Sequence, residues 1–251
     1  MSYAFYIAFG VLPSIIWLVY YLKKDRHPES NRMIILVFLL GMVAAPFGAL
    51  FECLPVGTTP KGLDCLSFSF FSDNFPSPWG YLLYSLLAVA LVEELVKYFV
   101  VRAKVMENSA LDEPIDVMLY MIISALGFAA LENILLLSQV APGPILDRIF
   151  FEKIGFLTAF RFVGATFLHA LASAIFGYFI ALSFFERKKR FWYFFLGLAA
   201  AVSFHGVYNF SIMQINNGFK FAFPAAILVF LAAIVTIAFR KLQKRKGVCK
   251  I

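Results

Sequence analysis

Two glutamates and a lysine, Glu93, Glu94 and Lys97, interrupt the apolar stretch 81–101, which is long enough to cross a lipid bilayer. A charge at the centre of a membrane helix costs about 2.5–3.5 kcal/mol, so ionisable groups at this depth are candidates for function. Lys97 follows Glu93 by four residues and Glu94 by three, which places all three side chains on one helix face. We expect Lys97 to act there as a charge-pairing residue.

Further polar side chains interrupt the next three hydrophobic segments: Glu132, Asn133, Arg161, His169, His205 and Asn209. Four side chains are suited to acid–base or metal chemistry: Glu93, Glu132, His169 and His205. At a rise of ~1.5 Å per residue, they lie at comparable depths, roughly 11 to 21 Å below the outer ends of their segments. Five charges lie inside the four segments, away from their ends: Glu93, Glu94, Lys97, Glu132 and Arg161. Left unpaired, these charges would cost on the order of 12 kcal/mol. We therefore expect four helices to direct them to one shared site.

Carboxylates and imidazoles without a Ser, Cys or Asp triad favour water as the nucleophile. A buried carboxylate can activate a water molecule, and imidazole groups with the Asn209 amide can stabilise the oxyanion of an attacked amide. Carboxylate and imidazole are also ordinary zinc ligands, although the motif His-Glu-x-x-His is absent. Both chemistries predict hydrolysis of a peptide bond within or at the edge of the membrane.

Composition assigns the chain to the membrane. Of its 251 residues, 62% are hydrophobic and only 15% are charged, whereas soluble proteins carry about 25% charged residues. Seven segments are apolar and long enough to span a bilayer, at about 3–22, 33–54, 79–102, 115–140, 156–185, 191–212 and 219–239. We predict an all-α, polytopic membrane helical bundle of about seven transmembrane helices, forming a single domain over residues 1–251.

The basic residues indicate how this bundle is oriented. With the N-terminus outside, sixteen of the 22 lysines and arginines fall in connections on the inside and four in connections on the outside. The positive-inside rule then predicts an N-out, C-in topology, and the same distribution argues against a nucleic-acid partner. Cys53 and Cys65 fall in or beside one outer connection, 55–78, and could form a disulfide in an oxidising space.

Four motifs, in order along residues 80–210, resemble those of PrsW-type intramembrane proteases: Glu93-Glu94-Leu-Val-Lys97, Phe128-x-x-x-Glu132-Asn133, Arg161 followed by His169, and His205-x-x-x-Asn209. The resemblance implies an integral protein of a bacterial plasma membrane that performs site-1 cleavage of a single-span membrane substrate, typically an anti-sigma factor. It implies a catalytic or metal-binding set of Glu93, Glu94, Glu132, His169 and His205. Asn209 becomes an oxyanion donor, and Lys97, Arg161 and Asn133 become structural or charge-pairing groups.

Alternatives stay open in both mechanism and function. PrsW proteins are labelled metalloproteases, with Glu93, Glu132, His169 and His205 as candidate zinc ligands here, whereas the distantly similar CAAX prenyl endopeptidases suggest a metal-free glutamate mechanism. Of the two we favour zinc. The wider superfamily includes a non-catalytic scaffold, and a proton- or ion-coupled transporter could use the carboxylates as relay groups. Cleavage of a single-span reporter by the purified protein would exclude both of these.

Overall fold

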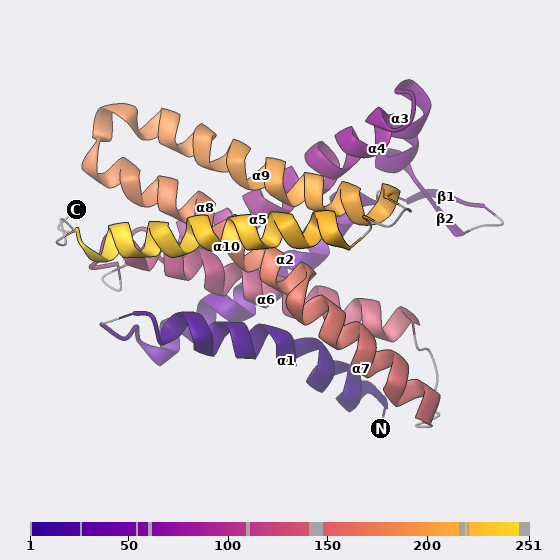
Figure 1. The fold of residues 1–251 in the computed structure, drawn as a ribbon, viewed down its shortest axis with the longest axis horizontal. Helices are drawn as coiled ribbons and strands as arrows, with labels where there is room; N and C mark the ends of the chain where they lie inside the picture. The colour runs from indigo at the N-terminus through magenta and orange to yellow at the C-terminus, as the bar shows by residue number, and fades with distance from the viewer. Residues whose placement is uncertain are drawn as a thin grey trace.

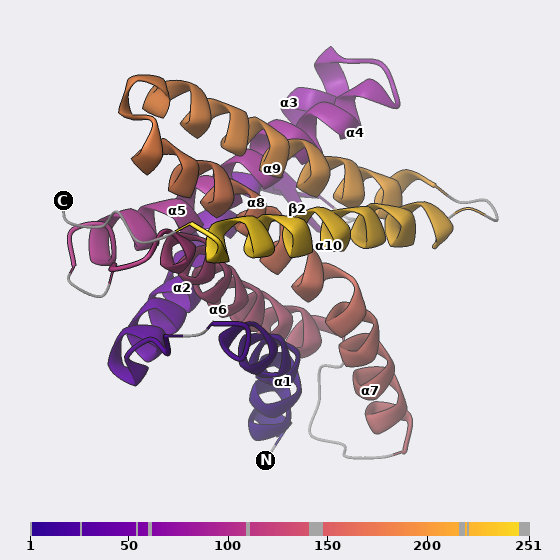
Figure 2. The same cartoon turned by 60° about the vertical axis from the view of Figure 1, so that its left-hand side comes forward.

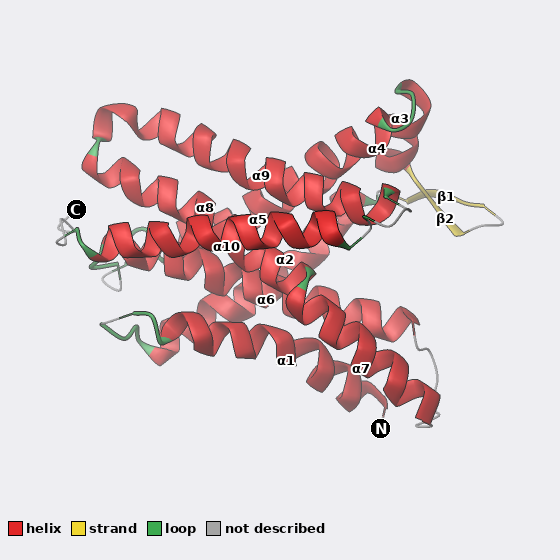
Figure 3. Ribbon diagram, in the orientation of Figure 1, coloured by secondary structure: helices red, strands yellow, loops and turns green. Residues whose placement is uncertain are grey.

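The computed structural model describes residues 2–25, 27–53, 55–59, 62–108, 111–140, 148–215, 219 and 221–245. Over these residues the chain forms a helical bundle with one two-stranded hairpin (Figures 1 and 3). The α-helices are α1 (Ser2–Leu22), α2 (Asn31–Glu52), α3 (Leu66–Asn74), α4 (Trp79–Leu83), α5 (Leu91–Lys104), α6 (Pro114–Val140), α7 (Arg148–Val163), α8 (Ala165–Phe185), α9 (Arg190–Gln214) and α10 (Ala222–Gln243). The π-helix η1 (Tyr84–Ala90), the 3-10 helix η2 (Arg187–Lys189) and strands β1 (Pro55–Thr59) and β2 (Gly62–Cys65) complete them. The all-α prediction is confirmed for the bundle.

The centre of the bundle is formed by α6 and α8. Helix α6 packs against α1, α2, α5 and α8, and its residues from Val117 to Ala130 are buried on every side. A helix that is apolar all round must be covered all round, which is why this segment lies inside. It begins at Pro114, where proline suits the first helical turn.

Glycines allow the central helices to approach closely. A β-carbon at Gly41 of α2 would collide with the carbonyl oxygen of Ser124 in α6, and one at Gly127 of α6 would collide with that of Phe38. Likewise, a β-carbon at Gly177 of α8 would lie 2.8 Å from the Cα of Met118. Small residues at such crossings are how membrane helices pack. They fix α2, α6 and α8, which carry part of the site.

Two helices depart from regular geometry next to the polar residues. Helices α4, η1 and α5 follow one another without a break, and the wide turns of η1 end just before Glu93; such π-helical turns often accompany functional sites. The predicted segment 156–185 is instead two helices, because the chain bends at Gly164 and α7 diverges from α8 (Figure 2). Trp17 of α1 holds this bend, stacking on Phe167 and donating to the carbonyl of Phe162 over 2.9 Å.

The count of seven membrane crossings stays a prediction. Among the described residues, six helical stretches are long and apolar enough to cross, with α7 and α8 counted as one. The seventh predicted segment is the run α4–η1–α5, which is long enough but carries five charged residues: Glu93, Glu94, Lys97, Arg102 and Lys104. The connection 55–78 holds structure that the sequence did not predict, namely the β1–β2 hairpin and α3, and the disulfide between Cys53 and Cys65 lies beside them.

The connections sort to the two ends of the bundle. Figure 1 shows the end of α10 with the α1–α2, α5–α6 and α8–α9 connections at one end of the bundle, and the start of α1 with the β-hairpin at the other. The basic connections therefore gather at one end, as the positive-inside rule requires of the cytoplasmic side. N-out, C-in remains the predicted orientation.

Candidate active site

The site is centred on one carboxylate oxygen, Oε2 of Glu93. Lys97 Nζ donates to it over 3.0 Å, His169 Nδ1 lies 3.4 Å from it, and His205 Nε2 lies 3.7 Å from it. All four residues are buried. Helices α5, α8 and α9, far apart in sequence, thus bring their predicted site residues to one point.

Lys97 fixes the tautomer of His169. The Lys97 ammonium lies 2.9 Å from His169 Nδ1, and because an ammonium can only donate, Nδ1 must accept. In the neutral ring the hydrogen is then on Nε2, which donates to Glu132 Oε2 over 2.9 Å. His169 therefore links the glutamates of two helices, Glu93 of α5 and Glu132 of α6.

Glu94 orients His205. Its Oε1 accepts from His205 Nδ1 over 3.0 Å and from Lys97 over 2.9 Å, while its Oε2 accepts from Ser173 Oγ over 2.6 Å. In the neutral His205 ring, the free lone pair on Nε2 therefore faces Glu93. Two acceptors that face each other, as Nε2 and Glu93 Oε2 do, need a proton or a cation between them.

Asn133 and Arg161 connect the site to the surrounding helices. The Arg161 guanidinium pairs with Glu132 Oε1 over 3.0 Å, and its Nε donates to Asn133 Oδ1. The amide nitrogen of Asn133 donates in turn to Thr166 Oγ1 over 3.0 Å and to the Gly10 carbonyl over 3.2 Å. These contacts suit the charge-pairing and structural roles predicted for both residues, which stay predictions.

A pocket of about 390 Å³ adjoins these groups, and Glu93, Glu132, Arg161, His169 and Asn209 all line it. The Glu132 side chain is 37% exposed, against 5% for Glu93, so Glu132 presents a carboxylate to the open space. Asn209 lies one helical turn beyond His205, as the spacing predicted, and faces the same pocket.

Sequence reasoning missed a fourth carboxylate, Glu52. It ends α2, lines the same pocket and interacts electrostatically with Glu93. Its backbone carbonyl accepts from Tyr84 Oη over 3.2 Å and from Ser67 Oγ, and the next residue, Cys53, forms the disulfide. A signal was present, because Glu52 is the sole charge in the segment 33–54. Its place at the very end of that segment made it look like a loop residue.

The residues present fit a divalent metal ion. Glu93, His169 and His205 offer ligand atoms within 4.8 Å of one another. Ligands about 2.0–2.2 Å from a tetrahedral zinc lie about 3.4 Å apart, close to the 3.4 and 3.7 Å separations from Glu93 Oε2. The bond between His205 and Glu94 is the outer carboxylate contact that metal-bound histidines commonly have. Binding through His169 Nδ1 would require Lys97 to give up that contact and remain with Glu94.

The formal charge of the site also favours a divalent metal ion. Four carboxylates, of Glu52, Glu93, Glu94 and Glu132, face two fixed cations, Lys97 and Arg161. With neutral histidines and every carboxylate ionised, the formal charge is −2, which one divalent cation would balance. Glu132, expected to be a ligand, lies outside the three-residue group and instead contacts His169 and Arg161.

A polytopic helical bundle with a buried carboxylate–imidazole centre beside a pocket has the groups that an intramembrane hydrolase needs. A family profile described as PrsW family intramembrane metalloprotease matches residues 29–238. The chain therefore belongs to the PrsW family of intramembrane metalloproteases, and the predicted protease activity and membrane location are confirmed at this level.

Curated relatives agree with this assignment. The chain is 28% identical to Protease PrsW of Geobacillus kaustophilus (strain HTA426) over 242 residues, covering 96% of this chain and 92% of the relative. It is 27% identical to Protease PrsW of Bacillus subtilis (strain 168) over 247 residues, covering 96% of each, and 25% identical to Protease PrsW of Clostridioides difficile (strain 630) over 208 residues, covering 81% of this chain and 77% of the relative. No solved structure matches the chain.

Proposed function

We propose that this protein hydrolyses a peptide bond in the membrane segment of a single-span protein, at the outer side of a bacterial plasma membrane. An anti-sigma factor is the substrate type that the motifs imply. The observation that carries the proposal is the convergence of Glu93, His169 and His205 beside a pocket that also contains Glu132. A peptide carbonyl placed in that pocket would meet both a base and hydrogen-bond donors.

In the proposed reaction, Glu132 is the general base, because it lines the pocket and its side chain is 37% exposed, against 5% for Glu93. It takes a proton from water as the water oxygen bonds to the carbonyl carbon. The Asn209 amide donates to the developing oxyanion. Glu132 then returns the proton to the amine nitrogen as the C–N bond breaks. Arg161 holds Glu132 in place through their ion pair.

We assign Glu93, His169 and His205 as the residues that would hold the metal, and zinc as its identity, since one carboxylate and two imidazoles form an ordinary zinc set. When bound there, a divalent ion supplies electrophilic polarisation of the scissile carbonyl and makes water a stronger acid. Glu94 is a positioning residue, since it reaches the metal set only through His205 and Lys97.

The test uses purified protein reconstituted with a single-span reporter tagged at both ends. Glu132→Gln is expected to slow cleavage by roughly 10²- to 10⁴-fold, the range of a general base, with metal content unchanged. Glu93→Gln is expected to abolish cleavage and to lower bound zinc, measured by elemental analysis. The matched control is Glu107→Gln, which makes the same change at a side chain that is 83% exposed, and it should cleave normally.

Two results would count against the proposal in different ways. Normal cleavage by the Glu93→Gln protein would overturn the site itself. Full activity after chelation, with no metal detected, would overturn the zinc assignment and leave a metal-free glutamate mechanism. Loss of activity on chelation that zinc restores is the expected result.

A further inference from the structure

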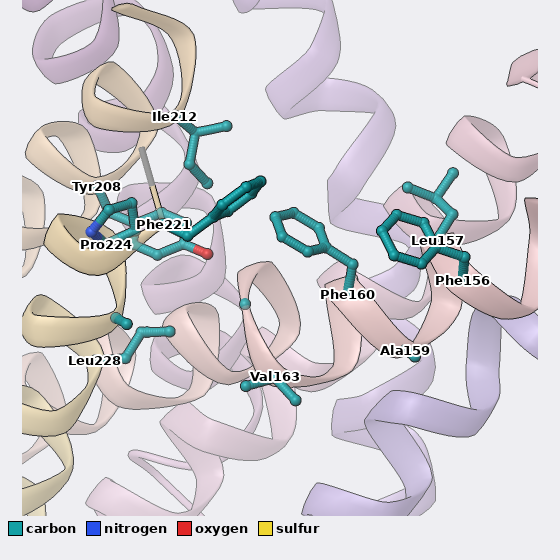
Figure 4. Close-up of a pocket in the computed structure, with 12 residues that line it drawn as sticks. Phe156, Leu157, Ala159, Phe160, Val163, Tyr208, Ile212, Phe221, Pro224 and Leu228 are labelled. Atoms are coloured by element: carbon teal, nitrogen blue, oxygen red, sulfur yellow. The ribbon is translucent and has the colours of Figure 1, made fainter. Parts of the chain in front are cut away.

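The pocket of about 390 Å³ that Glu93 and Glu132 line is called the catalytic pocket. A second cavity, which we call the apolar groove, lies beside it between α7 and α10. It measures about 600 Å³, within the range of ligand clefts. Phe156, Phe160 and Val163 of α7 form one wall and Phe221, Pro224 and Leu228 form the facing one (Figure 4). Among its lining residues neither a charged nor an amide side chain occurs, so the groove suits hydrocarbon and not water.

The apolar groove shares a wall with the catalytic pocket. Leu157, Phe160, Tyr208 and Ile212 line both spaces. Phe160 and Phe221 meet edge to face with ring centroids 6.0 Å apart, so this ring pair joins α7 to the residue that precedes α10. A chain lying in the groove would therefore lie next to the pocket that contains Glu132.

The outer edge of the groove faces the lipid. Phe156 is 74% exposed, Val163 59% and Phe221 64%. Exposed apolar side chains are ordinary on a membrane helix and mark no site by themselves. Here they border a hollow that shares a wall with the pocket of Glu93 and Glu132, which a surface facing only lipid does not need. The divergence of α7 from α8 at Gly164 leaves room for the hollow.

We propose that the apolar groove is where the membrane segment of the substrate docks, entering sideways from the lipid between α7 and α10. The inference rests on the proposed proteolytic function. A single-span segment already lies in the bilayer and can enter this hollow without crossing water. An intact helix is about 10–12 Å across, so one face seats in the groove while a few residues unwind past Phe160 toward Glu132.

The test compares two adjacent alanines of α10. Ala225 lines the groove, whereas Ala226 is also exposed but is not among the groove's lining residues. A photoreactive side chain is placed at each position in the full chain carrying Glu93→Gln, which holds substrate uncut. The probe is a reporter with one alanine–leucine membrane segment and an epitope tag at each end. We expect at least a fivefold stronger cross-link to the reporter from position 225.

Function is measured with the site intact. Ala225→Trp fills the groove and is expected to slow cleavage of the reporter by at least tenfold, while Ala226→Trp cleaves at the rate of the unmodified protein. Thermal unfolding in detergent should be the same for both, which separates blocked docking from misfolding.

Three other outcomes would overturn the docking proposal. Equal cross-linking from both positions would overturn the docking assignment. A phospholipid adduct at position 225 that the reporter does not displace would also overturn it and would make the groove a lipid site. Normal cleavage by the Ala225→Trp protein would overturn it as well. Failure of the proposed function would look different, because the unmodified protein would then not cleave the reporter and Glu93→Gln would change nothing.

Discussion

At the scale of single residues, the site depends on one buried cation. Lys97 touches Glu93, Glu94 and His169 and lies 4.5 Å from the centre of the Phe128 ring. Its side chain is fully buried, so no water replaces these partners. The i,i+3 and i,i+4 spacing predicted both ion pairs. The contact with His169, 72 residues away, could not be predicted because it depends on how α5 packs against α8.

We predict that Lys97→Ala destabilises the protein by about 3–5 kcal/mol, the cost of removing one partner from a buried charge pair. Its two glutamates would be left without their counter-ion. The measurement is thermal unfolding in detergent, together with the amount of protein that accumulates in the membrane.

Two variants make this prediction specific. Lys97→Ala combined with Glu94→Gln should recover part of the lost stability, since the formal charge of the site then returns to its original value. Lys189→Ala, which removes an exposed lysine paired with Glu186, should unfold like the unmodified protein. A double variant no more stable than Lys97→Ala alone would show that the loss comes from packing and not from charge.

At the scale of helices, sequence and structure agree where hydrophobic length decides and differ where the backbone bends. The predicted segments 115–140 and 191–212 correspond closely to α6 and α9. The segment 156–185 is apolar throughout, and its periodicity does not show that α7 leaves the axis of α8. Tertiary contacts surround the bend, since Trp17 of α1 contacts Phe162 and Phe167 on its two sides and Tyr208 of α9 lies close to Gly164.

We predict that Gly164→Ala lowers the free energy of unfolding by about 1–3 kcal/mol, the range for overpacking, and slows cleavage. A β-carbon there would lie 2.6 Å from Tyr208 Oη and 2.9 Å from the Phe160 carbonyl oxygen. Both residues line the catalytic pocket and the apolar groove. Thermal unfolding and reporter cleavage measure the two effects.

The same helix provides the control. A β-carbon at Gly155 of α7 meets no atom within 4 Å, so Gly155→Ala should stabilise the helix by roughly 0.5–1 kcal/mol and leave cleavage intact. If both variants behaved alike, the bend at Gly164 would not depend on the close contact with Tyr208.

At the scale of the whole molecule, composition and charge were enough to predict a membrane bundle, but not its layout. Hydropathy places helices in order along the chain and says nothing of which ones form the centre. The β1–β2 hairpin and α3 lie in a stretch rich in Pro, Gly and Ser, which reads as a plain connection. Glu52 belongs to the site because the hairpin, the disulfide and Tyr84 hold the end of α2 beside α5.

The orientation of the bundle gives the last prediction. A reporter fused after Ile251 should read cytoplasmic and one inserted near Gly62 should read external, because the basic connections gather at the end opposite the hairpin. The Cys53–Cys65 disulfide provides an independent measurement, since it persists only on an oxidising side. In intact cells the two cysteines should resist thiol labelling until a reductant is added from outside. Reversal of both reporters, with the cysteines labelled as free thiols, would place the hairpin in the cytoplasm and open the site to the other face of the membrane.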